Sequence, residues 1–342
     1  MLRAALRDLQ WRKKRFVIAM LGVALVFAMG LIMTGLTESF SLEVDRTLHA
    51  VGAEAWLVSD SATGPFTSFS PVPTAMVTDP DASPALVLRQ SIDHNGKIVD
   101  VVVIGAEPGR LGSVTASNGK SVAGPGEAVV DNDFTLAGLG DSFAIGGKSF
   151  KVVGTVSGQR LYAGLPMVYI ALSEAQKVSL QGQPYASTFI YPKMPTTVPP
   201  GLKAMSNAEV RSDVLRPLQN AMDSIALVRV LLWIVAATII GSVLYLQAME
   251  RTRDFAVFKA TGTSTAAIGV GLALQAVVLS LAAAVLAAIF GALLAPTFPM
   301  HVEIPSSAYA LLPVVTVVVG LLASLIALRK TATVQPAAAF GG

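Results

Sequence analysis

The hydrophobic and polar positions of this chain form four long apolar runs and one long mixed segment. An α-helix needs about 20 predominantly apolar residues to cross a bilayer. The pattern predicts transmembrane helices at residues 16–37, 223–249, 266–295 and 308–328. The first helix therefore stands apart, and the other three are clustered, with residues 296–307 as a short loop between the last two.

The first apolar run also has a feature of a cleaved signal peptide. Ala28-Met29-Gly30 places small residues at a spacing that signal peptidases accept. The run continues through Leu36, however, whereas the apolar core of a signal peptide spans about 7–15 residues. We therefore expect an uncleaved membrane anchor.

Residues 38–222 contain short runs rich in Val, Ile, Tyr and Phe. Branched and aromatic side chains favour strands because they pack well on a pleated surface. We expect a folded α/β domain, with hairpin turns at Asn95-Gly96 and Gly146-Gly147. Ser173 and Gln176 have capping-box spacing and predict the start of a short helix. Strands are expected from residues 55, 84, 98, 127, 167 and 187 onward.

Helical extensions of the first two spans are expected to flank this domain as a stalk. They cover residues 39–50 and 207–226. Pro217 lies inside the second extension and is expected to kink it, because proline lacks a backbone N–H. The Pro-, Gly- and Ser-rich residues 59–73 are expected to form a loop.

Composition supports a membrane protein: 53% of the residues are hydrophobic and 14% are charged, against about 25% charged in soluble domains. The absence of cysteine excludes disulfides and thiolate metal sites. A net charge of +3 is small and gives no reason to expect a nucleic acid partner.

The distribution of Lys and Arg predicts the orientation. These residues occur in segments 1–15, 250–265 and 329–342, and none occurs in 296–307. The positive-inside rule then places both termini in the cytoplasm and residues 38–222 outside it. Residues 1–15 are expected to form a cytoplasmic amphipathic helix against lipid headgroups, with a solvated basic tail as the alternative. The predicted fold class is four transmembrane α-helices in a 1+3 arrangement with a large extracytoplasmic α/β domain between spans one and two.

Motifs for catalysis, cofactors or metals are not apparent. Residues 112–121, "GSVTASNGKS", end like a phosphate-binding loop, but Val114 stands where that loop needs its first glycine. His49, His94 and His301 lack neighbours at ligand spacing. We expect no catalytic, cofactor or metal site in this chain. Arg229, one turn inside the second span, is expected to extend to the headgroups, with a buried functional charge as the alternative. Gln247 and Gln275 are candidates for hydrogen bonds between helices.

A charged patch at residues 249–264, "MERTRDFAVFKATGTS", interrupts the apolar last third of the chain. Its pattern suits one short helix that Gly262 ends, because glycine accepts the left-handed cap conformation. In such a helix Glu250 and Asp254 repel each other at i and i+4, which a partner with counter-charge would relieve. A polar turn that holds two spans at the surface is the alternative, and the residues alone leave both open.

The patch resembles the hallmark of FtsX/MacB-type ABC transporter permeases, the pattern Glu-Arg-x-x-(Glu/Asp)-(Phe/Ile)-(Ala/Gly)-x-(Leu/Phe)-(Lys/Arg)-Ala-x-Gly. The matching residues are Glu250, Arg251, Asp254, Phe255, Ala256, Phe258, Lys259, Ala260 and Gly262. The basic start, the single span, the large domain and the three clustered spans are similar to the family as well. The tail "LRKTATVQPAAAF" resembles the family's ending, except that Gln335 replaces an Asp and Phe340 a Leu.

The resemblance implies a permease subunit in the bacterial cytoplasmic membrane. The ATP and Mg would be bound by a separate cytoplasmic ABC ATPase in two copies, and residues 250–265 would be the coupling helix that contacts it. Its Phe255 and Phe258 are expected to anchor an apolar pocket of that ATPase. The residues implied in coupling are Glu250, Arg251, Asp254, Phe255, Phe258, Lys259 and Gly262.

The family also implies a second permease copy as a homodimer partner, lipid contact and an extracytoplasmic adaptor or solute-binding protein. ATP hydrolysis would move the extracytoplasmic domain in export or mechanotransmission. Two alternatives stay open: an importer permease for a small solute such as an amino acid, and a non-transport regulator of a cell-wall hydrolase.

Overall fold

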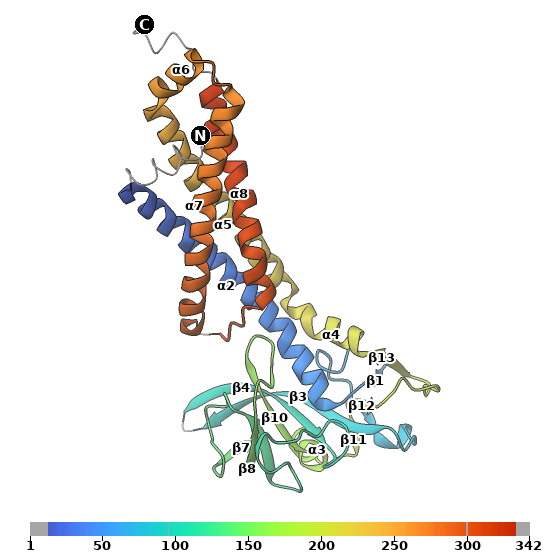
Figure 1. Cartoon of the computed structure of the whole chain (residues 1–342). Coiled ribbons are helices and arrows are strands. Elements are labelled where there is room, and N and C mark those ends of the chain that lie inside the picture. Colours follow the sequence, from blue (N-terminus) through green and yellow to red (C-terminus); the bar gives the residue numbers. More distant parts are fainter. Residues whose placement is uncertain (1–12, 95, 299, 333–342) are drawn as a thin grey trace. The chain divides into compact units, whose positions relative to one another are not determined.

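A computed structural model describes residues 13–94, 96–298 and 300–332. The chain divides into two compact units (Figure 1). We call residues 1–39 with 221–342 the helical unit, and residues 40–220 the sheet unit. The predicted amphipathic helix at 1–15 and the tail at 329–342 lie largely outside the described residues.

Four helices in the described part of the chain are long and apolar enough to cross a membrane. The long helices are α2 (Lys13–Val51), α5 (Gln219–Glu250), α7 (Thr265–Leu294) and α8 (Ser306–Ala332). The short helices α6 (Thr252–Ala260) and η3 (Ala295–Thr297) stand between them. The predicted 1+3 arrangement of spans is therefore confirmed.

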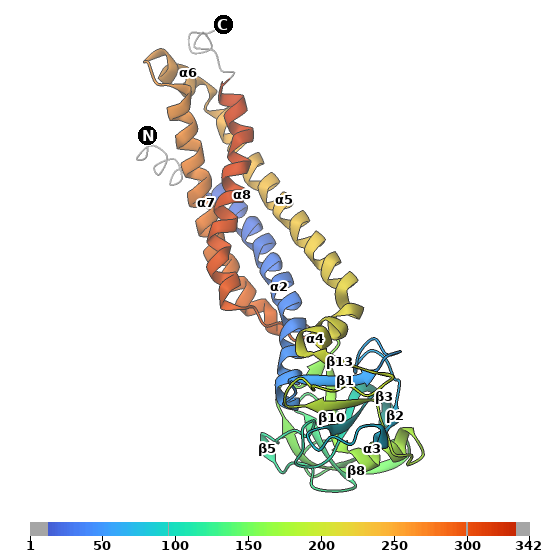
Figure 2. The ribbon, with the colours of Figure 1, turned by 90° about the vertical axis from the view of Figure 1, so that its right-hand side faces the viewer.

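Small residues let α7 and α8 pack side by side (Figure 2). A side chain at Gly320 of α8 would collide with the Ser280 hydroxyl of α7 and lie 3.3 Å from the carbonyl oxygen of Ala276. Close backbone approach of this kind stabilises helix pairs in membranes, where van der Waals packing replaces the hydrophobic effect. The predicted interhelical hydrogen bond of Gln247 is not formed: its buried amide O and N have no partner among the described residues.

The loop before α8 packs on α2 at a glycine. A Cβ at Gly35 would lie 2.7 Å from Cγ1 of Ile304, so only glycine fits there without displacement of the loop. The Glu303 backbone N–H donates to Oγ of Ser39 at 2.8 Å. Residues distant in the sequence thus fix one end of the helical unit.

The sheet unit is built on an 11-stranded mixed sheet with the order β13-β1-β12-β3-β4-β10-β6-β8-β5, with β7 paired to β8 and β9 to β10. β11 and β2 form a separate pair. The strands are β1 (Ala55–Ser59), β2 (Val72–Pro73), β3 (Ser83–His94), β4 (Lys97–Ala106), β5 (Asn118–Gly119), β6 (Glu127–Asp131), β7 (Ser142–Ile145), β8 (Lys148–Val156), β9 (Arg160–Leu161), β10 (Leu165–Ala171), β11 (Tyr185–Ala186), β12 (Thr188–Tyr191) and β13 (Leu202–Ser206). The helical segments are η1 (Thr74–Met76), α3 (Leu172–Ser179), α4 (Asn207–Leu215) and η2 (Arg216–Leu218).

Both predicted hairpins are confirmed. β3 and β4 pair through His94 and Lys97 around Gly96, which has φ +78°. β7 and β8 pair through Ile145 and Lys148 around two glycines with positive φ. All six predicted strand regions are strands in the structure. The unit therefore has the α/β fold class that its sequence predicts.

The predicted capping box at Ser173 is wrong. β10 runs to Ala171 and α3 begins at the next residue, so Ser173 lies inside the first helical turn and does not cap it. The actual capping box opens α4. The N–H of Glu209 donates to Oγ of Ser206, and the N–H of Ser206 donates to Oε2 of Glu209 at 2.7 Å. The predicted interruption at Pro217 is confirmed, because η2 separates α4 from α5.

Candidate functional site

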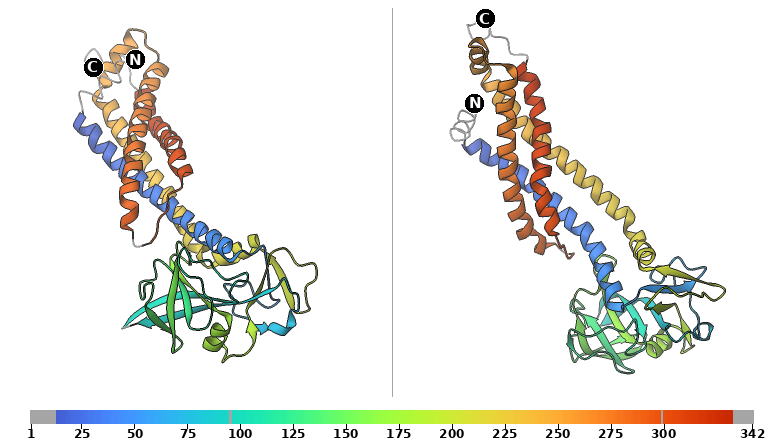
Figure 3. Two further views of the ribbon diagram at one scale, coloured as in Figure 1. Left: turned by 60° about the horizontal axis from the view of Figure 1, so that its bottom comes forward. Right: turned by 45° about the vertical axis from the view of Figure 1, so that its right-hand side comes forward.

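The charged patch forms a separate short helix at one end of the helical unit, where α6 joins α5 to α7 (Figure 3). α5 ends at Glu250, Arg251 has the non-helical angles φ −104° and ψ 14°, and α6 begins at Thr252. The expectation that Glu250 and Asp254 face each other in one helix is therefore wrong, because a helix boundary separates them. Asp254 instead accepts from Nε of Arg251 at 3.4 Å.

One face of α6 is buried within the chain. Phe255 is 5% exposed and packs with Ala248 of α5 and Ile268 of α7, and Phe258 packs against the same cluster. The expectation that Phe255 is available to anchor a partner's pocket is wrong, because its ring already holds α6 against the neighbouring helices. The guanidinium of Arg251 lies 5.6 Å from the centre of that ring, which adds a cation–π contact.

The opposite face of α6 is exposed. Arg253, Asp254, Val257 and Ala260 are exposed and recur at the spacing of one helical face. Val257 is 47% exposed and is an apolar residue between charged neighbours. α6 therefore has one face that packs within this chain and one that the chain leaves uncovered. Sequence reasoning chose the two phenylalanines over Val257, because the motif names residue types and not the faces on which they lie.

The end of α6 is fixed by Gly262, as the sequence predicts. The Thr263 N–H donates to the carbonyl of Phe258 at 2.8 Å, and the Gly262 N–H to that of Lys259 at 3.1 Å. This pair of bonds is the Schellman motif, which requires a left-handed residue, and Gly262 has φ +94°. Ser264 then caps α7 by accepting from the N–H of Ala267 at 3.2 Å. α6 is thus held at defined angles between two long helices.

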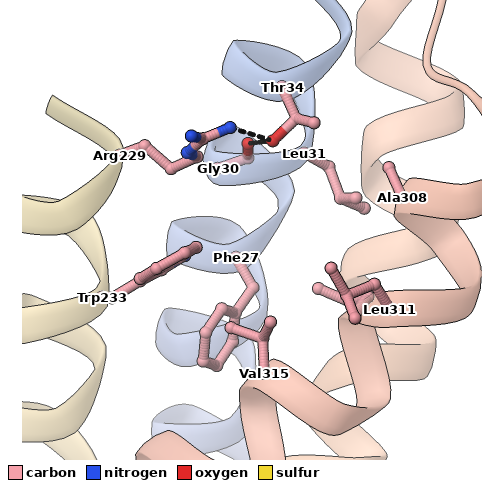
Figure 4. A pocket seen from close by; sticks show the side chains of 10 residues that line it. Phe27, Gly30, Leu31, Thr34, Arg229, Trp233, Ala308, Leu311 and Val315 are labelled. Atoms are coloured by element: carbon pink, nitrogen blue, oxygen red, sulfur yellow. Dashed lines mark hydrogen bonds between the residues drawn. The ribbon is translucent and has the colours of Figure 1, made fainter. Parts of the chain in front are cut away.

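A second feature of the helical unit is a cavity among α2, α5 and α8 (Figure 4). It encloses about 190 Å³. Arg229 reaches α2 from α5: its Nη1 donates to Oγ1 of Thr34 at 3.3 Å. The cavity is lined by Phe27, Gly30, Leu31, Thr34, Arg229, Trp233, Ala308, Leu311, Leu312 and Val315.

The sheet unit contains a partly buried ionic cluster that the sequence analysis missed. Arg160 of β9 pairs with Asp133 and lies 4.0 Å from Asp131 of β6. Burial raises the pKa of Asp131, although the Asp133 and Gln159 N–H groups donate to its carboxylate and oppose that shift. The cluster depends on strand pairing between residues far apart in the sequence, so no local pattern could have predicted it.

Residues 112–121 do not have the geometry of a phosphate loop. Asn118 and Gly119 form the short strand β5 paired to β8, and no helix follows them, whereas a phosphate loop opens a helix. Within the described ranges, no group of three His, Cys, Asp or Glu residues is placed to hold a metal ion.

The fold and these sites define a multi-spanning membrane protein with a large α/β domain inserted after its first span. Residues 226–336 match the model of the FtsX-like permease C-terminal family. Residues 17–207 match that of the MacB-like periplasmic core domain.

Two full-length relatives support the same family. An uncharacterized ABC transporter permease of Mycobacterium bovis is 42% identical over 354 residues, which cover 100% of both chains. One of Mycobacterium tuberculosis is 40% identical over 349 residues, again with 100% of both chains covered. The extracellular domain of the ABC-type transporter YknZ from Gram-positive bacteria aligns with 13% identity and a TM-score of 0.30, over 40% of this chain and 81% of that domain. The chain belongs to the FtsX/MacB-type ABC transporter permeases.

Proposed function

We propose that this chain is a permease subunit that couples ATP hydrolysis by a separate cytoplasmic ATPase to movement of its extracytoplasmic sheet unit. The observation that carries the proposal is α6, a short helix between two membrane helices with one face packed on them and the other exposed. The exposed face offers Val257 as an apolar contact, with Arg253 and Asp254 beside it. Membership of an ABC transporter permease family supports an ATPase as the partner.

The proposal assigns ATP and Mg to the partner ATPase and places both termini of the permease in the cytoplasm. It assigns the seven motif residues two roles. Phe255, Phe258, Gly262 and Arg251, whose guanidinium lies over the Phe255 ring, hold α6 within the chain. Asp254 lies beside Val257 on the exposed face, and Glu250 and Lys259 are assigned charged contacts with the ATPase outside that face.

Transmission along the permease requires an element that moves as one piece. α2 is an uninterrupted helix of 39 residues, Lys13–Val51, and therefore includes residues of both units. A stiff helix that is displaced at one end also moves at its other end, and such rigid elements can couple distant sites. We propose that α2 carries the motion, and that a second copy of the permease completes the assembly.

Co-purification of the ATPase from the native membrane tests the coupling role of α6. Val257→Asp places a charge in the apolar centre of the exposed face and is expected to release the ATPase. Burying an unpaired carboxylate in an interface costs several kcal/mol in order-of-magnitude terms. Val198→Asp is the matched control, because Val198 is also exposed but lies in the sheet unit.

The permease should remain inserted and folded in both variants, which its unfolding temperature in detergent would establish. Full retention of the ATPase by a folded Val257→Asp variant would remove α6 as the coupling element.

A further inference from the structure

The cavity among α2, α5 and α8 combines an apolar wall with a single cation. Its wall is formed mostly by Phe, Leu, Val, Ala and Trp side chains, and Arg229 is the one charged residue among those that line it. Figure 4 shows Arg229 and Trp233 reaching from α5 toward α2, with Leu311 and Val315 of α8 opposite. Among the described residues that line the cavity, none is a carboxylate that could balance the guanidinium.

The interactions of Arg229 leave its charge poorly compensated. Nη1 donates to Thr34, whose own hydroxyl donates to the Gly30 carbonyl at 2.9 Å. The Trp233 ring centre is 5.9 Å from the guanidinium carbon. Nε of Arg229 is shielded from solvent and has no hydrogen-bond partner among the described residues. A charged side chain within a transmembrane segment is costly, and such residues normally pair.

We propose that this cavity binds an anionic amphiphile of the membrane, with its phosphate or carboxylate on Arg229 and its acyl chain along the apolar wall. The guanidinium offers the fork of donors that planar or tetrahedral anions accept. Leu311 of α8 is 57% exposed, so the wall is continuous with surface that lipid can reach. The site goes beyond the proposed coupling function and does not depend on an ATPase.

The cavity is too small for a whole lipid. Its volume is about six times the roughly 30 Å³ that one water occupies in the liquid. It fits an anionic group and the first methylenes of one chain, while the rest of the chain lies on the outside of α5 and α8. Free phosphate uses none of the apolar wall and is therefore expected to bind weakly.

Fluorescence of Trp233 reports occupancy directly, because Trp233 lines the cavity. The chain has three tryptophans; Trp11→Phe removes one, and Trp56 is fully buried in the sheet unit. The probe is palmitoyl lysophosphatidylglycerol with bromines on the chain carbons near the headgroup. We expect saturable quenching in the purified full chain, absent in Trp233→Phe. Brominated monopalmitoylglycerol has the same chain without the anion and is expected to bind at least tenfold more weakly.

Two matched pairs of variants test the contacts. Arg229→Gln is expected to weaken binding about ten- to hundredfold, as loss of hydrogen bonds to a charged group does, while Arg216→Gln, exposed and outside the cavity, has no effect. Ala308→Phe fills the cavity and is expected to abolish binding. Ala310 is exposed on the same helix and does not line the cavity. Ala310→Phe therefore adds the same ring outside the cavity and is expected to bind the lipid as the parent does.

A stability readout separates a ligand site from a structural arginine. Without ligand, Arg229→Gln should unfold at the same or a higher temperature than the parent, because a poorly compensated charge is gone. The lipid should raise the unfolding temperature of the parent alone. Equal quenching in the parent and Arg229→Gln, equal competition by glycerol phosphate, or no quenching of Trp233 at all would each overturn the proposal. The last would be the result if a second copy covers the cavity.

Discussion

At the scale of single residues, backbone conformation decides where glycine is needed. Gly262 has φ +94°, and a Cβ there would meet no atom within 4 Å. Space is therefore available, and the left-handed conformation alone makes glycine necessary. Gly271 of α7 also has open space but lacks a positive φ, so it serves as a matched comparison.

Gly262→Ala is expected to destabilise the chain by about 1–2 kcal/mol, because a left-handed Cβ approaches the following carbonyl. Gly271→Ala is expected to be neutral or stabilising, since alanine is the better helix former. Unfolding temperatures of both variants in the same detergent measure the difference. Equal effects would mean that the Schellman motif does not hold α6.

The capping box of α4 gives a prediction about pH. Hydrogen bonds from the Ser206 N–H and hydroxyl lower the pKa of Glu209 from its ordinary value of 4.5. The stabilisation from this carboxylate is present above that ordinary value and is lost as the pH falls through the lowered pKa.

Glu209→Gln should therefore remove part of the pH dependence of the free energy of unfolding in the range between the lowered pKa and 4.5. Fluorescence of Trp56 can report the unfolding of the sheet unit around α4, because Nε1 of Trp56 donates to Oδ1 of Asn207, the first residue of α4, at 2.8 Å. Ser206→Ala should lower the free energy of unfolding by about 1 kcal/mol. In that background, Glu209→Gln should change the free energy of unfolding less than it does in the parent. An identical pH profile for the parent and Glu209→Gln would contradict the assignment.

At the scale of elements, α6 has an inner and an outer face with different roles. Phe255 is 5% exposed and fills the contact with Ala248 and Ile268, while Val257 is 47% exposed. The two residues are two positions apart, about 200° around a helix, and so point to opposite sides.

Phe255→Ala is expected to lower stability by about 3 kcal/mol, because a buried ring leaves a cavity. Val257→Ala should change stability by less than about 0.5 kcal/mol, as exposed substitutions do, and should weaken only ATPase retention. Unfolding in detergent and ATPase co-purification, measured on the same preparations, separate the two effects. A larger loss of stability in Val257→Ala would reverse the assignment of faces.

Sequence patterns predicted elements well where the local signal was strong. β4 contains a run of β-branched residues, β10 has Val, Tyr and Ile in succession, and the hairpins carry paired turn residues. β13, "LKAMS", was missed because it has no β-branched or aromatic residue and depends on pairing with β1. The predicted capping box at Ser173 was wrong because β10 ends at Ala171 and α3 begins at the next residue. For the candidate site, the motif located α6, but the burial of Phe255 and the turn of Arg229 toward α2 depend on tertiary packing that no local pattern contains.

At the scale of the whole molecule, the account depends on which side of the membrane each segment occupies. The chain has no cysteine, so an introduced cysteine is a unique label. Ile98 in the sheet unit and Val257 on α6 are both well exposed. Ile98→Cys should react with a membrane-impermeant thiol reagent in intact cells, and Val257→Cys only after the membrane is opened and the ATPase is removed. The reverse pattern would invert the orientation.

The central claim is that the exposed face of α6 contacts a separate ATPase. The most direct measurement is site-specific cross-linking from a short photoreactive group attached to Val257→Cys in native membranes, with Val198→Cys as the control. A covalent adduct with the ATPase is expected from position 257 and is expected to be absent from position 198. Adducts only with lipid, or only with a second copy of the permease, would contradict it.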